Sequence, residues 1–307
     1  MSDNVFVYGV GMIKFGKHLD LGVKQLTDYI PGPDMGTNEA AMALVRDEGG
    51  RCVGLPRVLG GIPLDEIGAT AWGVVASADV AKDVAGLELE GARIAMQGFG
   101  AVGKHAARFF ADRGAILVAA ADYSGAVHDA EGLDVDAIAK HVEGGGRIAD
   151  YEGGERLHRE AIISVDCDIL VPAARPDVIR ADNQATVKAK LIVQGANIGV
   201  TEKAEAMLHR RGVLCIPDFI SNAGGVICGA VEYAGGSEGQ VFSIIEEKIR
   251  RNTAEVLERM KHERILPREA AVQMARERLA EAMMFRRFSS GWSVQAPRPD
   301  VDLRAVS

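Results

Sequence analysis

Three glycines and an aspartate between positions 93 and 122 are the residues whose types and spacing point most directly to chemistry. Gly98, Gly100 and Gly103 form the pattern G-x-G-x-x-G directly after an apolar run, and Asp122 follows about 20 residues later. In this pattern the first glycine permits a sharp turn, the second lets the backbone approach a pyrophosphate, and the third lets a helix pack closely on a sheet. The spacing therefore predicts dinucleotide binding, although a turn whose glycines serve packing alone would have the same pattern.

The charges at the two ends of this segment indicate which dinucleotide would bind. A helix is expected to follow Gly100, and its first residues, Ala101 and Val102, would present unpaired N–H groups and a dipole that favour an anion. The carboxylate of Asp122 can accept hydrogen bonds from ribose hydroxyls but would repel a 2′-phosphate. The sequence therefore favours NAD over NADP as the cofactor.

The order of the surrounding segments predicts a Rossmann-like α/β fold with a doubly wound parallel sheet, because apolar strand-like runs alternate with amphipathic helical runs. The expected strands are 93–98, 116–121, 167–171, 190–194 and 213–216, and the expected helices are 65–84, 102–113, 133–143, 201–211, 241–263 and 267–285. Three units follow: a truncated N-terminal remnant and hinge segment over 1–60, an NAD-binding domain over 61–235, and C-terminal helices with a poorly ordered tail over 236–307.

Polar loops follow three of the expected strands. Ligands bind at the carboxyl ends of parallel strands, where the loops 171–175, 195–201 and 217–226 would meet. Asn197 and Asn222 occupy matching positions in two of these loops, where their amides could contact a nicotinamide carboxamide. Each asparagine could instead be a turn residue bonded to its own backbone.

Composition excludes several classes of protein. The 307 residues are 48% hydrophobic and 25% charged, as in globular proteins, and no apolar run is long enough for a membrane span. A net charge of −8 argues against nucleic-acid and anionic-membrane partners. The N-terminus lacks the features of a secretory signal. The four cysteines are scattered and suggest buried free thiols rather than a metal site, so we expect a cytoplasmic protein.

Six segments carry a family resemblance. They are PGPDMGTNEAAMA (31–43), GGIPLDEIGAT (60–70), QGFGAVGKHAARF (97–109), CDILVPAA (167–174), QGANIGVT (194–201) and PDFISNAGGVICGAVEY (217–233). Taken in order, they resemble the glutamate/leucine/phenylalanine/valine dehydrogenase family, and its glutamate dehydrogenase branch most closely.

The resemblance implies oxidative deamination of an L-amino acid, glutamate-like, to a 2-oxo acid and ammonium, with hydride passing from the substrate Cα to a nicotinamide. Asp34 matches the carboxylate that moves protons to and from the amino nitrogen, and is therefore the predicted catalytic residue. A carboxylate that only closes a turn is the alternative. The other positions that the family carries over contact the cofactor, namely Thr70, Asp122, Ala173, Asn197 and Asn222.

One family motif has no counterpart. Relatives bind the substrate carboxylate with a glycine-rich lysine motif, whereas K-G-G does not occur in this sequence. Three hypotheses follow: an active dehydrogenase whose lysine comes from a partner or a second copy in a homo-oligomer, an NAD-binding remnant with a regulatory or assembly role, and a Rossmann enzyme of another class that uses Asp34. Residues 4–18 resemble the opening strand of thiolase-like enzymes, from which we infer no thiolase chemistry.

Overall fold

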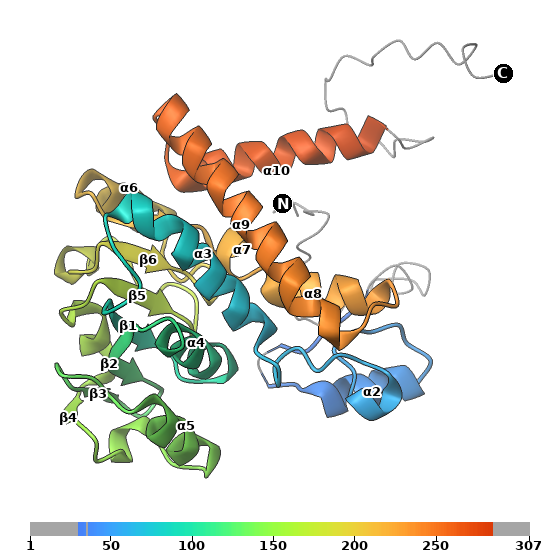
Figure 1. The fold of residues 1–307 in the computed structure, drawn as a ribbon, viewed down its shortest axis with the longest axis horizontal. Helices are drawn as coiled ribbons and strands as arrows, with labels where there is room; N and C mark the ends of the chain where they lie inside the picture. The colour runs from blue at the N-terminus through green and yellow to red at the C-terminus, as the bar shows by residue number, and fades with distance from the viewer. Residues whose placement is uncertain (1–29, 35, 285–307) are drawn as a thin grey trace.

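A computed structural model describes residues 30–34 and 36–284, and its centre is a seven-stranded sheet in the order β4-β3-β2-β1-β5-β6-β7 (Figure 1). The strands are β1 (Arg93–Gln97), β2 (Ile116–Ala121), β3 (Ala126–His128), β4 (Glu155–Leu157), β5 (Ile169–Pro172), β6 (Leu191–Val193) and β7 (Leu214–Ile216). Strands β2, β1, β5, β6 and β7 are parallel, which confirms the Rossmann-like α/β class. The expected segments 4–18 and the C-terminal tail lie outside the described residues.

The sheet is not parallel throughout, which corrects the sequence prediction. Strands β3 and β4 pair antiparallel to their neighbours and extend the edge beyond β2. The turn between β2 and β3 is too short for the crossover that a parallel pair requires, so β3 must run back along β2. Both added strands have three residues, too few for an alternating pattern to stand out in the sequence.

Helices surround this sheet close to the predicted positions. They are α2 (Glu39–Asp47), α3 (Ala69–Ala85), α4 (Ala101–Ala111), α5 (Val135–Glu143), α6 (Glu202–Arg210), α7 (Asp218–Ser221), α8 (Gly224–Tyr233), α9 (Glu238–Glu263) and α10 (Pro267–Met284), with 3-10 turns η1 (Arg57–Leu59), η2 (Ile148–Asp150), η3 (Arg159–Ser164) and η4 (Gln184–Thr186). The helix expected from residue 65 begins at Ala69, because Gly68 has φ 73° and interrupts the helical backbone. Helix α9 begins earlier than expected, because Ser237 and Gln240 form a capping box.

Both faces of the sheet are buried, as a mainly parallel sheet requires. Ile94 and Met96 belong to a core shared with α3, α4 and α5, whereas Ala95 belongs to a second core closed by α6 and the 3-10 turns. Along β1, the side chains therefore alternate between two interiors. The carboxyl ends of the parallel strands remain the edge at which loops from both layers meet.

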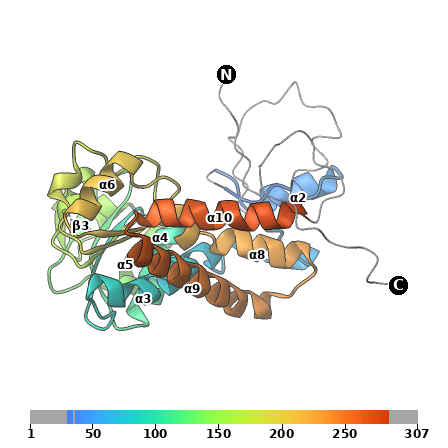
Figure 2. The ribbon, with the colours of Figure 1, turned by 90° about the horizontal axis from the view of Figure 1, so that it is seen from above.

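Helix α9 packs on the sheet layer through α3, whereas α10 contacts α9 and strand β7. Helix α9 lies along α3, where the buried hydroxyl of Thr253 donates to Ser77 at 3.1 Å (Figures 1 and 2). Arg250 on α9 forms ion pairs with Asp79 on α3 and with Glu246 one turn earlier. The boundary that we predict near residue 235 therefore divides the chain between elements in direct contact, and it stays a prediction.

Three backbone N–H groups of the N-terminal segment bind one carboxylate on α8, in addition to the bonds of Arg57 to Glu238 and of Arg51 to Tyr233. Glu232 accepts hydrogen bonds from the backbone N–H groups of Gly54 at 2.8 Å, Ile62 at 3.1 Å and Leu55 at 3.3 Å. Both views place α2 at the end of the molecule away from strand β3 (Figures 1 and 2). Asp34 precedes this segment, so Glu232 connects the predicted catalytic residue to the rest of the fold.

Residues 30–34 and 36–284 contain neither a membrane-spanning helix nor a metal-ligand cluster. None of the helices in these ranges has the length and apolar character needed to cross a bilayer. Nor do these ranges contain a group of histidine, cysteine, aspartate and glutamate side chains arranged to hold a metal ion. All four cysteines are buried and unpaired, although Cys167 precedes strand β5 rather than lying in it.

Gly224 should be essential for packing α8 on α3. A Cβ at position 224 would lie 2.1 Å from the carbonyl oxygen of Ala69, so backbone must move to admit it. We expect Gly224→Ala to lower the free energy of unfolding by about 2–3 kcal/mol. Gly239→Ala is the control, because no atom lies within 4 Å of its added Cβ, and it should raise stability by about 0.5–1 kcal/mol. Urea unfolding measures both, and equal effects would contradict the packing argument.

Candidate active site

The carboxyl ends of β1, β2 and β5 bring the glycine-rich turn into contact with two neighbouring loops. Gly98 N donates to the carbonyl of Ala121 at 2.9 Å, and Ala173 N donates to the carbonyl of Gln97 at 2.6 Å. Strand β1 lies between β2 and β5, which are reached by connections on opposite sides. Such a switch point opens a crevice above the sheet, where α/β proteins bind their ligands.

Two of the three motif glycines are required by the fold itself. Gly98 has φ 103°, and a Cβ there would lie 2.7 Å from the nitrogen of Ala174. A Cβ on Gly103 would lie 1.8 Å from the carbonyl oxygen of Gly98, which no rearrangement of side chains could relieve. For these two positions, packing alone accounts for glycine.

Gly100 is different, because the described part of the chain gives no reason for glycine there. Its φ of −79° suits any residue, and nothing lies within 4 Å of an added Cβ. Gly100 is the N-cap of α4, and no side chain caps this helix end. An exposed glycine in front of uncapped N–H groups at Ala101 and Val102 fits the close approach of a phosphate-bearing group.

The predicted nicotinamide side of the crevice is held together by amide contacts. The amide of Asn222 donates to the side-chain oxygen of Asn197 at 2.7 Å, which joins the loops after β6 and β7. Gly195, in the first of these loops, lies beside Val102 and Ala173, with virtual Cβ distances of 3.0 and 3.2 Å. The structure therefore places Val102, Ala173, Asn197 and Asn222 around one edge.

Thr70 reaches the same edge from helix α3. A Cβ on Gly225 would lie 2.6 Å from the hydroxyl oxygen of Thr70, and Gly225 follows Asn222 at the start of α8. Small residues at this helix start let the first turn of α3 approach the asparagine pair. Thr70 is half-buried there.

Asp122 lies beside the glycine turn, but its carboxylate is engaged by its own loop. One oxygen accepts hydrogen bonds from Ser124 N at 2.7 Å, from the Ser124 hydroxyl and from Gly125 N at 3.3 Å. The other accepts from Ile148 N at 3.1 Å. A carboxylate has about four acceptor positions in all. Any bond to a ribose hydroxyl would therefore use the oxygen that faces Ile148.

Asp34 occupies the turn that its motif predicts. Asp34 N donates to the hydroxyl oxygen of Thr37 at 2.9 Å, and Thr37 N donates back to the carbonyl of Asp34 at 2.9 Å. The side chain is exposed rather than partly buried, which differs from our expectation for a proton-transferring carboxylate. The described chain does not cover this turn with a second layer of its own.

Asp65 and His105 are titratable neighbours that the sequence analysis missed. Burial, followed by the nearby carboxylates of Glu39 and Asp34, raises the pKa of Asp65 to about 6. His105, on α4, lies against Gly68, and burial is the main cause that lowers the pKa of its imidazole. The first turn before α3 thus places a weakly acidic carboxyl near Asp34. No motif marks it, because the contacts that raise its pKa are made across the fold.

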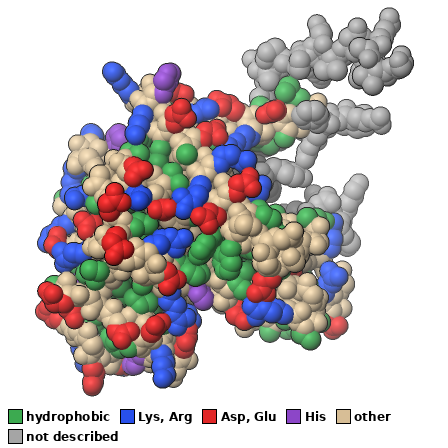
Figure 3. Space-filling view, in the orientation of Figure 1, with side chains coloured by type: hydrophobic (Ala, Val, Ile, Leu, Met, Phe, Trp, Pro, Cys, Tyr) green, Lys and Arg blue, Asp and Glu red, His purple; other side chains and the backbone are tan. Residues whose placement is uncertain are grey.

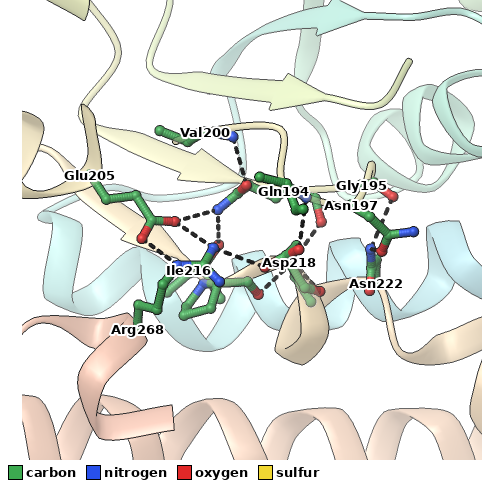
Figure 4. Close-up of polar contacts among 12 residues, drawn as sticks. Gln194, Gly195, Asn197, Val200, Glu205, Ile216, Asp218, Asn222 and Arg268 are labelled. Atoms are coloured by element: carbon green, nitrogen blue, oxygen red, sulfur yellow. Dashed lines mark hydrogen bonds and ion pairs between the residues drawn. The ribbon is translucent and has the colours of Figure 1, made fainter. Parts of the chain in front are cut away.

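A second missed group lies behind the asparagine loops (Figure 4). Gln194 and Asp218, which follow β6 and β7, interact with Glu205 on α6 and with Arg268 on α10. The two strand-end residues could have been suspected from their positions. Arg268 carries no such signal, because α10 is more than 40 residues distant in sequence.

Charged side chains of both signs are distributed over one face of the molecule. Figure 3 shows acidic and basic side chains interspersed on the face seen in Figure 1, without a continuous basic stripe. Phosphate backbones bind surfaces on which lysine and arginine gather. The face seen in Figure 3 has no such gathering among the described residues.

The raised pKa of Asp65 should appear as a pH-dependent cost to stability. The native carboxyl keeps its proton up to about pH 6, whereas the unfolded one loses it near pH 4. The native state therefore binds more protons between these values, and stability falls as the pH rises through this window. Asp65→Asn should remove the cost and be more stable than the unchanged protein by about 1–2 kcal/mol at pH 7, after allowance for solvent screening.

Urea unfolding of both proteins at pH 4, 5, 6 and 7 measures this difference. Carboxylates whose pKa values are lowered by ion pairs are present in both proteins. Their pH-dependent contributions to the free energy of unfolding therefore cancel in the difference. A difference that stays constant across the series would contradict the assignment.

Comparison with known proteins agrees with this geometry. The family model for glutamate/leucine/phenylalanine/valine dehydrogenase matches residues 60–287. A glutamate dehydrogenase from Aeropyrum pernix is 36% identical over 86% of this chain and 66% of its own length. An NADP-specific glutamate dehydrogenase from Saccharolobus shibatae is 37% identical over 71% of this chain and 54% of its own length.

Solved structures extend the comparison. A hetero-hexameric glutamate dehydrogenase from Thermus thermophilus, in a leucine-bound form, superposes with a TM-score of 0.76 and 29% identity, covering 85% of this chain and 65% of its own. Glutamate dehydrogenase from Peptoniphilus asaccharolyticus gives a TM-score of 0.67 and 26% identity over 85% of this chain and 67% of its own. The chain spans between about half and two thirds of the length of the curated relatives it matches. On these matches, the chain belongs to the glutamate/leucine/phenylalanine/valine dehydrogenase family.

Proposed function

We propose that this protein is an NAD-dependent amino-acid dehydrogenase, which oxidatively deaminates a glutamate-like L-amino acid to a 2-oxo acid and ammonium. The observation that carries the proposal is Gly100. It stands uncapped and open at the start of α4, beside loops that carry Asn197 and Asn222. A bound ligand that approaches the backbone at position 100 would leave no room for a side chain there and would explain the glycine. A pyrophosphate fits this place, because it can accept hydrogen bonds from the exposed N–H groups.

Each predicted site residue would then have a distinct task. Backbone N–H groups at Ala101 and Val102 would bind the pyrophosphate, and Asp122 would accept from a ribose hydroxyl while repelling a 2′-phosphate. Thr70, Ala173, Asn197 and Asn222 would line and orient the carboxamide end. When bound there, the nicotinamide accepts hydride from the substrate Cα.

Asp34 would hold or release the proton of the substrate amino nitrogen. Its exposed turn lies close enough to Asp65 to raise the pKa of that carboxyl. A carboxylate transfers protons best when water is excluded. We therefore propose that Asp34 works in an enclosed site completed by a second surface.

A homo-oligomer would supply that surface, and a lysine from a partner or a second copy would bind the substrate carboxylate. K-G-G is absent from this sequence, and the Thermus thermophilus relative is described as hetero-hexameric. The proposal includes a small-molecule substrate and a cytoplasmic location. The alternative is an NAD-binding protein without turnover, with a regulatory or assembly role, which the exposure of Asp34 favours.

Gly100→Ser tests the dinucleotide site without weakening the fold. Serine caps helices at least as well as glycine, so stability should hold or rise, while its hydroxyl would occupy the N–H groups that a pyrophosphate needs. We expect NADH affinity to fall by about tenfold or more. Gly239→Ser, which also meets nothing within 4 Å, is the matched control and should bind normally.

Calorimetric titration with NADH and NADPH measures these affinities. The unchanged protein should bind NADH more tightly than NADPH, because Asp122 opposes a 2′-phosphate. Unaltered NADH binding by Gly100→Ser would remove the main support for the site.

Asp34→Asn separates turnover from binding. The amide keeps the size of the side chain but cannot take a proton, so deamination should fall at least about a hundredfold. NADH affinity should change by less than about twofold, since Asp34 has no role in binding the cofactor. NADH formation with a panel of L-amino acids, in the oligomer as isolated, provides the rate. A variant that keeps the full rate would refute the proton-transfer role, and an inactive unchanged protein that binds NADH would favour the alternative.

A further inference from the structure

Behind the asparagine loops lies a buried ionic cluster of Gln194, Glu205, Asp218 and Arg268, here called the Arg268 network (Figure 4). Arg268 donates to both oxygens of Glu205, at 2.6 and 2.7 Å, and to one oxygen of Asp218 at 2.8 Å. The side chains of Arg268, Glu205 and Asp218 are 17%, 6% and 8% exposed. A single guanidinium thus fixes two carboxylates that have little contact with solvent.

The network reaches the cofactor edge through the second oxygen of Asp218. That oxygen accepts the backbone N–H of Ile198 at 2.8 Å. Two residues further on, Val200 N donates to the side-chain oxygen of Gln194 at 2.9 Å, and the amide nitrogen of Gln194 donates to Glu205 at 2.9 Å. Two of the backbone hydrogen bonds that fix the loop after β6 therefore lead back to Arg268, while others join the loop to Pro172 and to the segment 177–179.

The anchored loop has an unfavourable backbone conformation. Ile198 has φ 53°, in the left-handed region that β-branched residues rarely adopt. Its side chain is 49% exposed, so burial of the isoleucine does not hold it there. The bond from Ile198 N to Asp218 holds this conformation, together with the bond that Asp177 N donates to the carbonyl of Ile198 at 2.8 Å. Asn197 directly precedes this residue, and its contact with Asn222 depends on the same loop geometry.

We propose that Arg268 is a positioning residue for the nicotinamide end of the cofactor site. Through Asp218 it holds Ile198 in the left-handed conformation that sets Asn197 against Asn222. The first turn of α10 thereby becomes part of the active-site architecture. The inference rests on the proposed function, because it assigns the asparagine pair to the carboxamide.

A purely stabilising role would not need this arrangement. Buried ion pairs add little net stability compared with apolar packing of the same volume, because both partners lose solvent. Their directional bonds instead specify one geometry. Here the specified geometry is that of a strained loop at the ligand edge.

The test compares NADH with ADP-ribose, which carries the pyrophosphate but lacks the nicotinamide. Arg268→Gln should weaken NADH binding by about tenfold while changing ADP-ribose affinity less than about threefold. Arg268→Lys can still contact one carboxylate, so its NADH affinity should lie between those of the unchanged protein and of Arg268→Gln. Arg259→Gln is the control, because Arg259 is 19% exposed and pairs bidentately with Glu277, between α9 and α10 and away from the loop after β6. Arg259→Gln should leave the ratio of the NADH and ADP-ribose affinities unchanged, whatever its effect on stability.

A second measurement does not depend on the cofactor. Hydrogen exchange of the Ile198 amide should be at least about tenfold faster in Arg268→Lys than in the unchanged protein and in Arg259→Gln. Equal loss of NADH and ADP-ribose affinity, or unchanged exchange at Ile198, would overturn the positioning role and leave the proposed function standing. If the unchanged protein binds ADP-ribose no better than a Gly100→Ser variant does, the proposed dinucleotide site is wrong. The positioning role of Arg268, which rests on that site, is then wrong as well.

Discussion

Helix α4 approaches strand β1 so closely that the virtual Cβ of Gly103 overlaps the carbonyl of Gly98, at 1.8 Å. This backbone contact fixes the position of α4 on the sheet. The N-terminus of α4 lies at the carboxyl end of β1, the strand between β2 and β5. Val102 then meets Gly195, and the loops after β5 and β6 close around the same point. The direction of the exposed N–H groups follows from a packing constraint that needs no ligand. On the proposed function, the start of α4 would hold an anion without a prior rearrangement of the helix.

Two locally unfavourable features occur at this same edge, one at a helix start and one in a loop. Helices α2, α5 and α6 are capped by the side chains of Asn38, Asp134 and Thr201, whereas α3, α4, α7 and α8 have no side-chain cap, and α4 begins at an exposed glycine. The backbone at Ile198 is left-handed in a residue that disfavours it. Proteins tend to keep such departures where function requires them and to offset their cost elsewhere. Here the offset is visible in the Arg268 network, whose bonds hold the strained loop from behind.

Sequence reasoning succeeded where the physical cause is local. Strand β2 was predicted with its observed bounds, and the glycine spacing gave the turn, because periodicity and backbone freedom act over a few residues. It failed for β3 and β4, which are too short for a pattern, and for Asp65, whose raised pKa arises from residues brought together only by folding. Asp122 shows a third kind of limit. The same carboxylate suits both a ribose and the Asx-type turn that it closes with Ser124, and spacing alone cannot separate the two uses.

The position of Asp34 depends on a weaker connection than the one that positions the glycines. The glycine turn is built into the sheet, while the segment after Asp34 is attached through side chains: three of its N–H groups converge on Glu232, Arg57 pairs with Glu238, and Arg51 donates to Tyr233. A segment fixed mainly by side-chain bonds opens more readily than one fixed by a strand ladder. Proton transfer and hydride transfer would therefore depend on parts of different rigidity, and a surface that encloses Asp34 would also restrain its segment. Enclosure by a second copy would in this way both exclude water and bring the proton-transferring carboxylate to a fixed distance from the reacting carbon.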